Sequence, residues 1–143
     1  LEQIERHEGL ELKPYRCTSE KLTIGIGRNL EDVGISKEEA YMLLENDVKT
    51  VQQQIETYMP WASSLNTARH AALTNFVFNV GIGTALKFEN AMAALKASDF
   101  DIAAEQLLDS RWANQVGQRS MEISEQIRNK VSLSTKKIIV LFC

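Results

Sequence analysis

The chain has 143 residues, 44% hydrophobic and 24% charged, which indicates one soluble globular domain. Its formal net charge of −3 argues against a nucleic-acid binder, which needs a basic surface for phosphate contacts. Seven glycines and two prolines are few for a loop-rich protein, so we expect a mainly helical chain. No stretch approaches the ~18 apolar residues of a membrane span, so we expect no stable membrane association.

The two cysteines, Cys17 and Cys143, form neither a disulfide framework nor a spaced zinc motif. With only two histidines in the chain, a structural metal site is not expected. The first residues lack a basic start followed by an apolar run, so we expect no signal peptide.

The spacing of apolar residues predicts a helix at the start of the chain and a strand soon after it. Residues 1–8 have the pattern of a helix end, and Gly9 is suited to close that helix. Apolar residues then alternate with Thr or Gly over residues 22–27, which predicts a strand. Together with residues 12–17, this segment predicts a small hairpin.

Helices are predicted over the rest of the chain. Ser36 and Glu39 form a capping box at the start of a long helix, residues 36–59. Its expected apolar stripe is Tyr41, Leu44, Val48, Val51, Ile55 and Tyr58, and Pro60 ends it. After Asn66 we expect a buried central helix broken by Gly81 and Gly83, a helix capped by Ser98 and Asp101, and an amphipathic segment after Gly117.

These patterns predict an α+β fold that is mainly α. We expect one domain over residues 1–143, made of a small hairpin lobe (1–35), a connecting helix (36–59) and a helical lobe (60–128). Residues 129–143 fit no continuation of the last helix and form an atypical tail, apolar over 138–142.

Glu8 is a candidate general acid. It lies at the C-terminal end of a predicted helix, where the helix dipole disfavours an ionised carboxylate. A general acid must hold its proton near neutral pH, and this environment suits that role. By position alone, an ordinary surface glutamate remains the simpler interpretation.

Three further features belong to the hairpin. Thr23 is predicted on one strand face with Gly25 and Gly27, and a face without side chains lets a ligand approach the backbone closely. A bulge or twist of the hairpin explains the glycines equally well. Cys17 ends the opposing strand and is either a small buried hydrophobe or a reactive thiol.

The spacing Glu8-x8-Cys17-x5-Thr23, with the strand Thr-Ile-Gly-Ile-Gly, closely resembles the phage-type (T-even) lysozymes, endolysins that cut peptidoglycan. Their triad is Glu, then Asp or Cys, then Thr. Three further segments resemble the family in order, so the resemblance covers about residues 1–128; they are residues 34–40, 69–81 and 110–115.

The resemblance implies a two-lobe lysozyme fold and hydrolysis of the β-1,4 bond between N-acetylmuramic acid and N-acetylglucosamine. It implies that Glu8 protonates the leaving oxygen, while Cys17 and Thr23 hold the attacking water across a cleft. No metal or organic cofactor is implied. An inverting reaction needs roughly 6.5–9.5 Å between two carboxyl groups.

Cys17 departs from the common Asp of the family. A neutral thiol orients water weakly, whereas a thiolate is a stronger base and can also attack the sugar itself, so inversion and retention both stay open. Arg16 and Lys21 are near in sequence and could favour the thiolate. Glu20 stands where the family has Gly and is expected to point to solvent.

Other residues follow from the resemblance. Substrate contacts fall at Asn29, Phe78 and Gln106, although an aromatic residue such as Phe78 on an apolar helix is more often part of the core. Arg119 matches an arginine that supports the catalytic glutamate across the cleft. Arg28 and Asp47 are expected to form a structural pair.

We therefore expect a monomeric endolysin that acts on peptidoglycan glycan strands and lyses bacteria, as an antimicrobial hydrolase. It would accumulate in the host cytoplasm and need a holin to reach the cell wall. One alternative is a catalytically impaired homologue that binds peptidoglycan without cutting it. The other is a purely helical interaction module, which leaves the Glu-Cys-Thr spacing unexplained.

Overall fold

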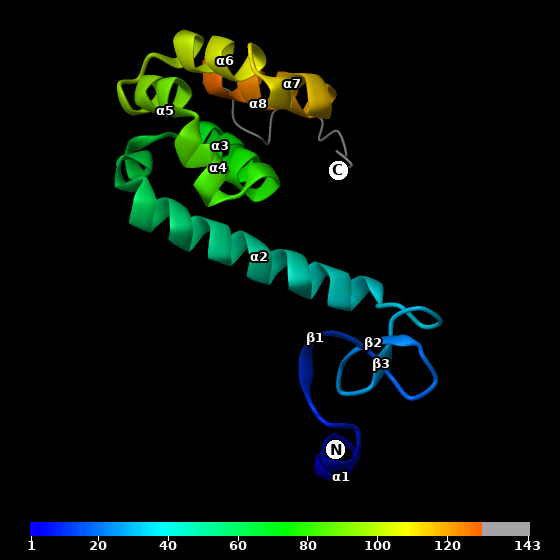
Figure 1. Cartoon of the computed structure of the whole chain (residues 1–143). Coiled ribbons are helices and arrows are strands. Elements are labelled where there is room, and N and C mark those ends of the chain that lie inside the picture. The colour runs from blue at the N-terminus through cyan, green and yellow to red at the C-terminus, as the bar shows by residue number, and fades with distance from the viewer. Residues whose placement is uncertain (130–143) are drawn as a thin grey trace. The chain divides into compact units, whose positions relative to one another are not determined.

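The computed structural model describes residues 1–129 and is mainly helical, with one small antiparallel sheet (Figure 1). The predicted α+β class is confirmed. Two compact units divide between Leu44 and Glu45, inside the long helix α2 (Lys37–Tyr58). The expectation of one domain over residues 1–143 stays a prediction. The atypical tail was expected at residues 129–143, and residues 130–143 of it lie outside the described residues.

The first unit begins with helix α1 (Glu2–Glu8), as predicted. Gly9 ends it with φ 79°, a left-handed conformation that glycine adopts without strain, and its N–H donates to the Glu5 carbonyl at 2.8 Å. Glu8 is therefore the last helical residue, directly before the chain turns into the sheet.

The sheet has the order β1 (Glu11–Arg16), β2 (Leu22–Gly25) and β3 (Arg28–Asn29), all antiparallel. The hairpin is confirmed, with Tyr15 opposite Thr23 and Arg16 opposite Leu22. The short strand β3 was not predicted, because two residues carry no periodicity.

The predicted strand over 22–27 is too long. Gly25 and Gly27 have φ of 71° and 74°, and the chain turns after Gly25 into β3. Gly27 therefore does not share a strand face with Thr23, and the turn accounts for these glycines.

Helix α2 begins with the predicted capping box. The Ser36 N–H donates to Glu39 Oε1 at 2.9 Å, and the Glu39 N–H donates to Ser36 Oγ at 3.1 Å. The apolar stripe is only partly correct: Val51 and Ile55 are buried and Val48 is half-buried, but the other three predicted members are exposed, namely Tyr41, Leu44 and Tyr58.

The second unit is helical. After α2 its elements are the 3₁₀ helix η1 (Pro60–Ser64) and helices α3 (Thr67–Val80), α4 (Ile82–Lys87), α5 (Glu89–Lys96), α6 (Phe100–Leu108), α7 (Arg111–Val116) and α8 (Gln118–Arg128). Helix α8 packs against both α3 and α6 (Figure 1).

The core of this unit forms around α3, which is the predicted central helix. Phe76 is fully buried, with Phe88 and Trp112 edge-on to its ring at centroid distances of 5.0 and 4.9 Å. The Trp112 indole N–H donates to Asn79 Oδ1 at 2.7 Å, which satisfies the polar atom of that buried side chain. Helix α7, which contains Trp112, is thus held against α3.

Two boundary predictions in this unit are wrong. Gly81 separates α3 from α4 with φ 84°, but Gly83 lies inside α4. Helix α6 starts after Asp99 rather than at a cap formed by Ser98 and Asp101, and Asp99 makes no side-chain capping bond. Ser98 instead adopts the left-handed conformation, with φ 63°, in the turn before the helix.

Arg69 of α3 is an unpredicted buried charge, 4% exposed. Its Nε donates to the Ile127 carbonyl at 2.6 Å and its Nη2 to the Arg128 carbonyl at 3.1 Å, which satisfies carbonyls at the end of α8. Its guanidinium also lies 3.4 Å from the centre of the Phe100 ring. Burial lowers the pKa of Arg69 from its usual value.

Within residues 1–129, none of the helices is both long and apolar enough to cross a membrane.

Candidate active site

The side chain of Glu8 lies against Gly27 of the turn between β2 and β3. A Cβ added at Gly27 would be 2.6 Å from Glu8 Oε2 and 2.9 Å from its Cδ, closer than such atoms approach one another. Gly27 therefore leaves the space that the carboxyl group occupies. The same glycine also holds φ 74°, so two independent reasons favour glycine there.

Cys17 and Thr23 come together at the other end of the hairpin. Thr23 is 3% exposed, and its hydroxyl donates to the Lys21 carbonyl at 2.8 Å. Cys17 is a half-buried free thiol. The backbone N–H of Lys21 is the largest cause that lowers the pKa of Cys17, followed by the N–H of Ser19, and burial acts in the opposite direction.

The Ser19 hydroxyl also lowers the pKa of Cys17, and the Thr23 hydroxyl, whose hydrogen is donated to the Lys21 carbonyl, lies close to the sulfur. N–H and O–H groups that point at sulfur stabilise the thiolate relative to the thiol. The sequence suggested that the Arg16 and Lys21 side chains would do this, but Lys21 contributes through its backbone, and Arg16 is not among the causes. The backbone of the turn, rather than side-chain charge, is the main source of this environment.

The turn that carries Cys17 is tightly bonded. The Cys17 N–H donates to the Lys21 carbonyl at 3.0 Å, and the Glu20 N–H donates to the Cys17 carbonyl at 2.9 Å. Glu20 is exposed, as expected, and has φ 61°, which glycine would adopt more easily. The expectation that its carboxylate does not replace the usual Asp stays a prediction.

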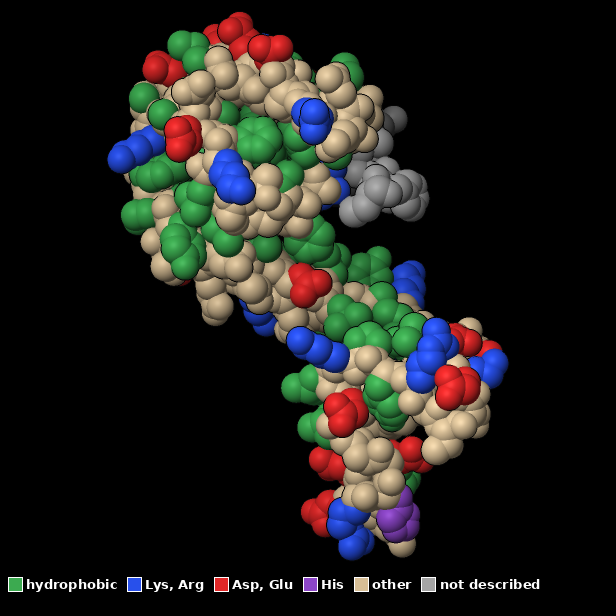
Figure 2. Space-filling view, viewed as in Figure 1, with side chains coloured by type: hydrophobic (Ala, Val, Ile, Leu, Met, Phe, Trp, Pro, Cys, Tyr) green, Lys and Arg blue, Asp and Glu red, His purple; other side chains and the backbone are tan. Residues whose placement is uncertain are grey.

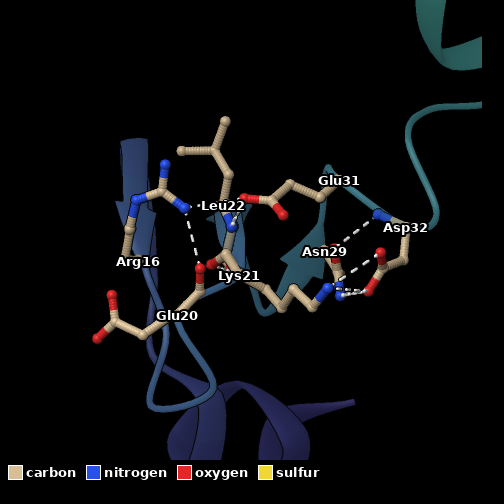
Figure 3. A network of polar contacts seen from close by, with 8 residues as sticks. Arg16, Glu20, Lys21, Leu22, Asn29, Glu31 and Asp32 are labelled. Carbon is tan, nitrogen blue, oxygen red and sulfur yellow. Dashed lines mark hydrogen bonds and ion pairs between the residues drawn. The ribbon is translucent and has the colours of Figure 1, made fainter.

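Polar side chains from the segment after β3 reach back to this turn (Figure 3). Arg16 Nη1 donates to Glu31 Oε1 at 2.9 Å and to the Glu20 carbonyl at 2.9 Å. The Leu22 N–H donates to Glu31 Oε1 at 3.0 Å. That N–H, and then Arg16, lower the pKa of Glu31.

Asn29, predicted to contact substrate, is bonded to Asp32. Its Nδ2 donates to Asp32 Oδ2, and its Oδ1 accepts from the Asp32 N–H, both at 3.0 Å. The Lys21 ammonium lies 3.4 Å from the same carboxylate. Figure 2 shows basic and acidic side chains close to one another on the surface of the first unit.

Arg28 is bonded within the first unit, and its expected pairing with Asp47 of the second unit stays a prediction. Arg28 Nη1 donates to Glu39 Oε1 at 2.7 Å and to the Gly34 carbonyl at 3.2 Å. The Arg28 bond is the main cause that lowers the pKa of Glu39 to about 2, and the Ser36 N–H is the second. Glu39 thus joins the end of the sheet to the start of α2.

Three predicted residues lie in the second unit. Phe78 is half-buried and packs against the core, as the simpler interpretation expected. Gln106 is exposed and lines a hollow of about 210 Å³ together with residues 87–91. Arg119 of α8 is 8% exposed, and its Nε and Nη2 donate to Asn75 Oδ1 at 3.0 and 2.8 Å. Its pairing with Glu8 stays a prediction.

The described residues contain no group of three or more His, Cys, Asp or Glu side chains that could hold a metal ion.

Sequence comparisons identify the family. The phage lysozyme family model matches residues 5–130. The chain is 30% identical to the pre-baseplate central spike protein Gp5 of enterobacteria phage T4 over 86% of this chain, although it spans only 26% of that protein.

Two other relatives are matched over most of their own length. The chain is 30% identical to the endolysin of Acyrthosiphon pisum secondary endosymbiont phage 1, over 82% of this chain and 80% of the relative. It is 26% identical to the probable T4-type lysozyme 1 of Dictyostelium discoideum, over 81% and 85%. The family is a class of glycoside hydrolases, the lysozymes, and the chain belongs to it.

Proposed function

We propose that this protein is a muramidase that hydrolyses the β-1,4 bond between N-acetylmuramic acid and N-acetylglucosamine in peptidoglycan. The observation that carries the proposal is the fit of the Glu8 carboxyl group against Gly27, next to a sheet that also joins Cys17 to Thr23. Glu8, Cys17 and Thr23 are the three positions that match the triad of the family. All three come from one compact unit.

Glu8 is the proposed general acid, which protonates the oxygen of the leaving sugar. Thr23 and Cys17 are proposed to act on the opposite side of the bond. Because the Thr23 hydroxyl has a single hydrogen, donation to the Lys21 carbonyl leaves its lone pairs free to accept from a water molecule. A Cys17 thiolate can accept the second proton of that water.

Residues outside the triad are proposed to bind the substrate or to support Glu8. Asn29, Phe78 and Gln106 contact the glycan strand, and Arg119 orients Glu8. The endolysin relative favours a lytic role, in which a monomer reaches the cell wall from the host cytoplasm after a holin opens the membrane. Residues 1–143 act as one domain in this proposal.

The test is digestion of purified peptidoglycan, with borohydride reduction of the new chain ends. A muramidase creates reducing N-acetylmuramic acid ends, whereas a glucosaminidase creates N-acetylglucosamine ends and a transglycosylase creates none. The variant Glu8→Gln should lose the activity, because an amide cannot donate the proton. The matched variant Glu5→Gln, one turn earlier on the same exposed helix, should keep it.

Clearing of chloroform-treated Gram-negative cells provides the cellular assay. If the folded protein binds peptidoglycan but neither clears cells nor creates new ends, it is the binding homologue instead. Equal loss of activity in Glu5→Gln and Glu8→Gln would also contradict the role of Glu8.

Cys17 decides the stereochemistry. A water activated by the thiolate gives inversion, whereas direct attack by sulfur on the sugar gives a covalent intermediate and retention. The anomer of the first product separates these two routes, with Cys17→Asp and Cys17→Ser as comparison variants. A Ser variant with the full wild-type rate would exclude both roles of the thiolate.

A further inference from the structure

Arg16 and Leu22 form the last matched pair of the β1–β2 ladder before the turn that carries Cys17. Glu31, which comes from the segment after β3, contacts both of them through one oxygen. It accepts from the Arg16 guanidinium and from the Leu22 N–H, at 2.9 and 3.0 Å. A side chain from outside the hairpin thus ties together the two strands at the point where the turn begins.

Arg16 also reaches into the turn. The Nη1 atom that contacts Glu31 donates to the Glu20 carbonyl, four residues along the chain. Glu20 holds a strained left-handed conformation, and its own N–H is bonded to the Cys17 carbonyl. Figure 3 displays Arg16 pointing toward Glu20 and Glu31 from the end of β1.

The turn matters because its backbone faces the thiol. The N–H groups of Ser19 and Lys21 lie inside the turn, and they act on the Cys17 sulfur. Their direction depends on the turn conformation, because an N–H interaction weakens steeply when it is misaligned. Any contact that fixes Glu20 therefore also fixes these two donors.

We propose that Arg16 and Glu31 are positioning residues for Cys17, which hold the turn so that its N–H groups stay directed at the sulfur. The importance of this arrangement for catalysis rests on the proposed function. The arrangement of the thiol itself does not depend on that function. Neither Arg16 nor Glu31 has a counterpart in the motif that identified the site.

Stability alone does not explain the pair. The side chains of Arg16 and Glu31 are 58% and 38% exposed, and ion pairs at such positions contribute little to the free energy of unfolding. We therefore expect their removal to change the thiol more than the melting temperature.

The direction in which the pKa of Cys17 changes separates a positioning role of Glu31 from a simple effect of its charge. The charged groups around the turn are Arg16, Glu20, Lys21, Glu31 and Asp32. If Glu31 acted only through its charge, its neutralisation would remove a nearby negative charge and favour the thiolate, which lowers the pKa of Cys17. If Glu31 acts by holding the turn, replacing it with Ala removes the accepting oxygen as well as the charge, which misaligns the N–H donors and raises that pKa.

The experiment measures the rate of iodoacetamide alkylation against pH in the full chain, in a Cys143→Ser background so that Cys17 is the reacting thiol. Glu31→Ala, which removes the accepting oxygen, should move the midpoint to higher pH. Glu31→Asp keeps the charge but shortens the side chain, so it should also move the midpoint upward. The matched variant Glu38→Ala removes an equal charge from the exposed first turn of α2 and should leave the midpoint unchanged.

Circular dichroism melting identifies any variant that is not folded, and Glu31→Asp is the milder change if Glu31→Ala unfolds. A downward or absent shift in the folded Glu31 variants would refute the positioning role. If the wild type digests peptidoglycan, we expect these variants to lower kcat by roughly three- to tenfold with little change in KM. If the wild type does not digest it but the midpoint still rises, the proposed function fails while the positioning of the thiol stands.

Discussion

Replacing Gly27 with Ala tests the contact on which the candidate site depends. The added Cβ would be 2.6 Å from Glu8 Oε2, whereas ordinary contact begins at 3.4 Å. The carboxyl group must therefore withdraw by about 0.8 Å, and a displacement of about 1 Å at a reacting group can reduce the rate about a hundredfold. We expect the peptidoglycan hydrolysis rate of Gly27→Ala to fall ten- to a hundredfold.

The same substitution should cost little stability, because Glu8 is an exposed and flexible side chain that can move away. What remains is the cost of φ 74° for a residue with a Cβ, about 1–2 kcal/mol. Gly34→Ala is the matched control: its φ is 69°, and no atom lies within 4 Å of the added Cβ. Its loss of stability should be similar.

Two measurements on both variants separate the loss of stability from the loss of activity. Urea unfolding gives the stability, and the rate at which new reducing ends form gives the activity. Equal rates per folded molecule for Gly27→Ala and Gly34→Ala would refute the argument that Gly27 makes room for the catalytic acid. A far larger loss of stability in Gly27→Ala would show that the backbone, rather than Glu8, absorbs the clash.

Two further predictions concern stability. The pKa of Glu39 is lowered to about 2 from the usual 4.5, so Glu39 stabilises the fold above about pH 4.5 and loses this contribution as the pH falls toward 2. The difference in unfolding free energy between wild type and Glu39→Gln should shrink over that window; a difference that persists at pH 2 would contradict the pairing with Arg28. Arg69→Met should cost about 2–4 kcal/mol in urea unfolding, because two carbonyls at the end of α8 lose their donor; a loss below about 1 kcal/mol would indicate that other groups satisfy them.

Local patterns were sufficient for several elements. The capping box of Ser36 and Glu39 and the cap at Gly9 follow from residue chemistry within a few positions, and the structure confirms both. The buried α3 was also predicted, because its apolar residues surround most of the helix. Where a boundary depended on side chains that could cap in several registers, as at Ser98, the prediction was wrong.

The site was only partly accessible from the sequence. Spacing and family resemblance selected Glu8, Cys17 and Thr23, and the structure brings Cys17 and Thr23 together. The contact between Glu8 and Gly27 joins segments that are far apart along the chain, and the glycine pattern alone was equally consistent with a turn. Glu31 carried no signal, because an exposed glutamate in a loop is common in any chain.

The sequence by itself determined the class of the fold, the family and the identity of the three candidate catalytic residues, because these follow from periodicity and from a motif of fixed spacing. Only the tertiary structure decided the partners of the charged residues. Arg28 bonds Glu39, and Arg16 bonds Glu31. A long flexible side chain can reach several partners, and which one it meets depends on how the chain turns after Gly25.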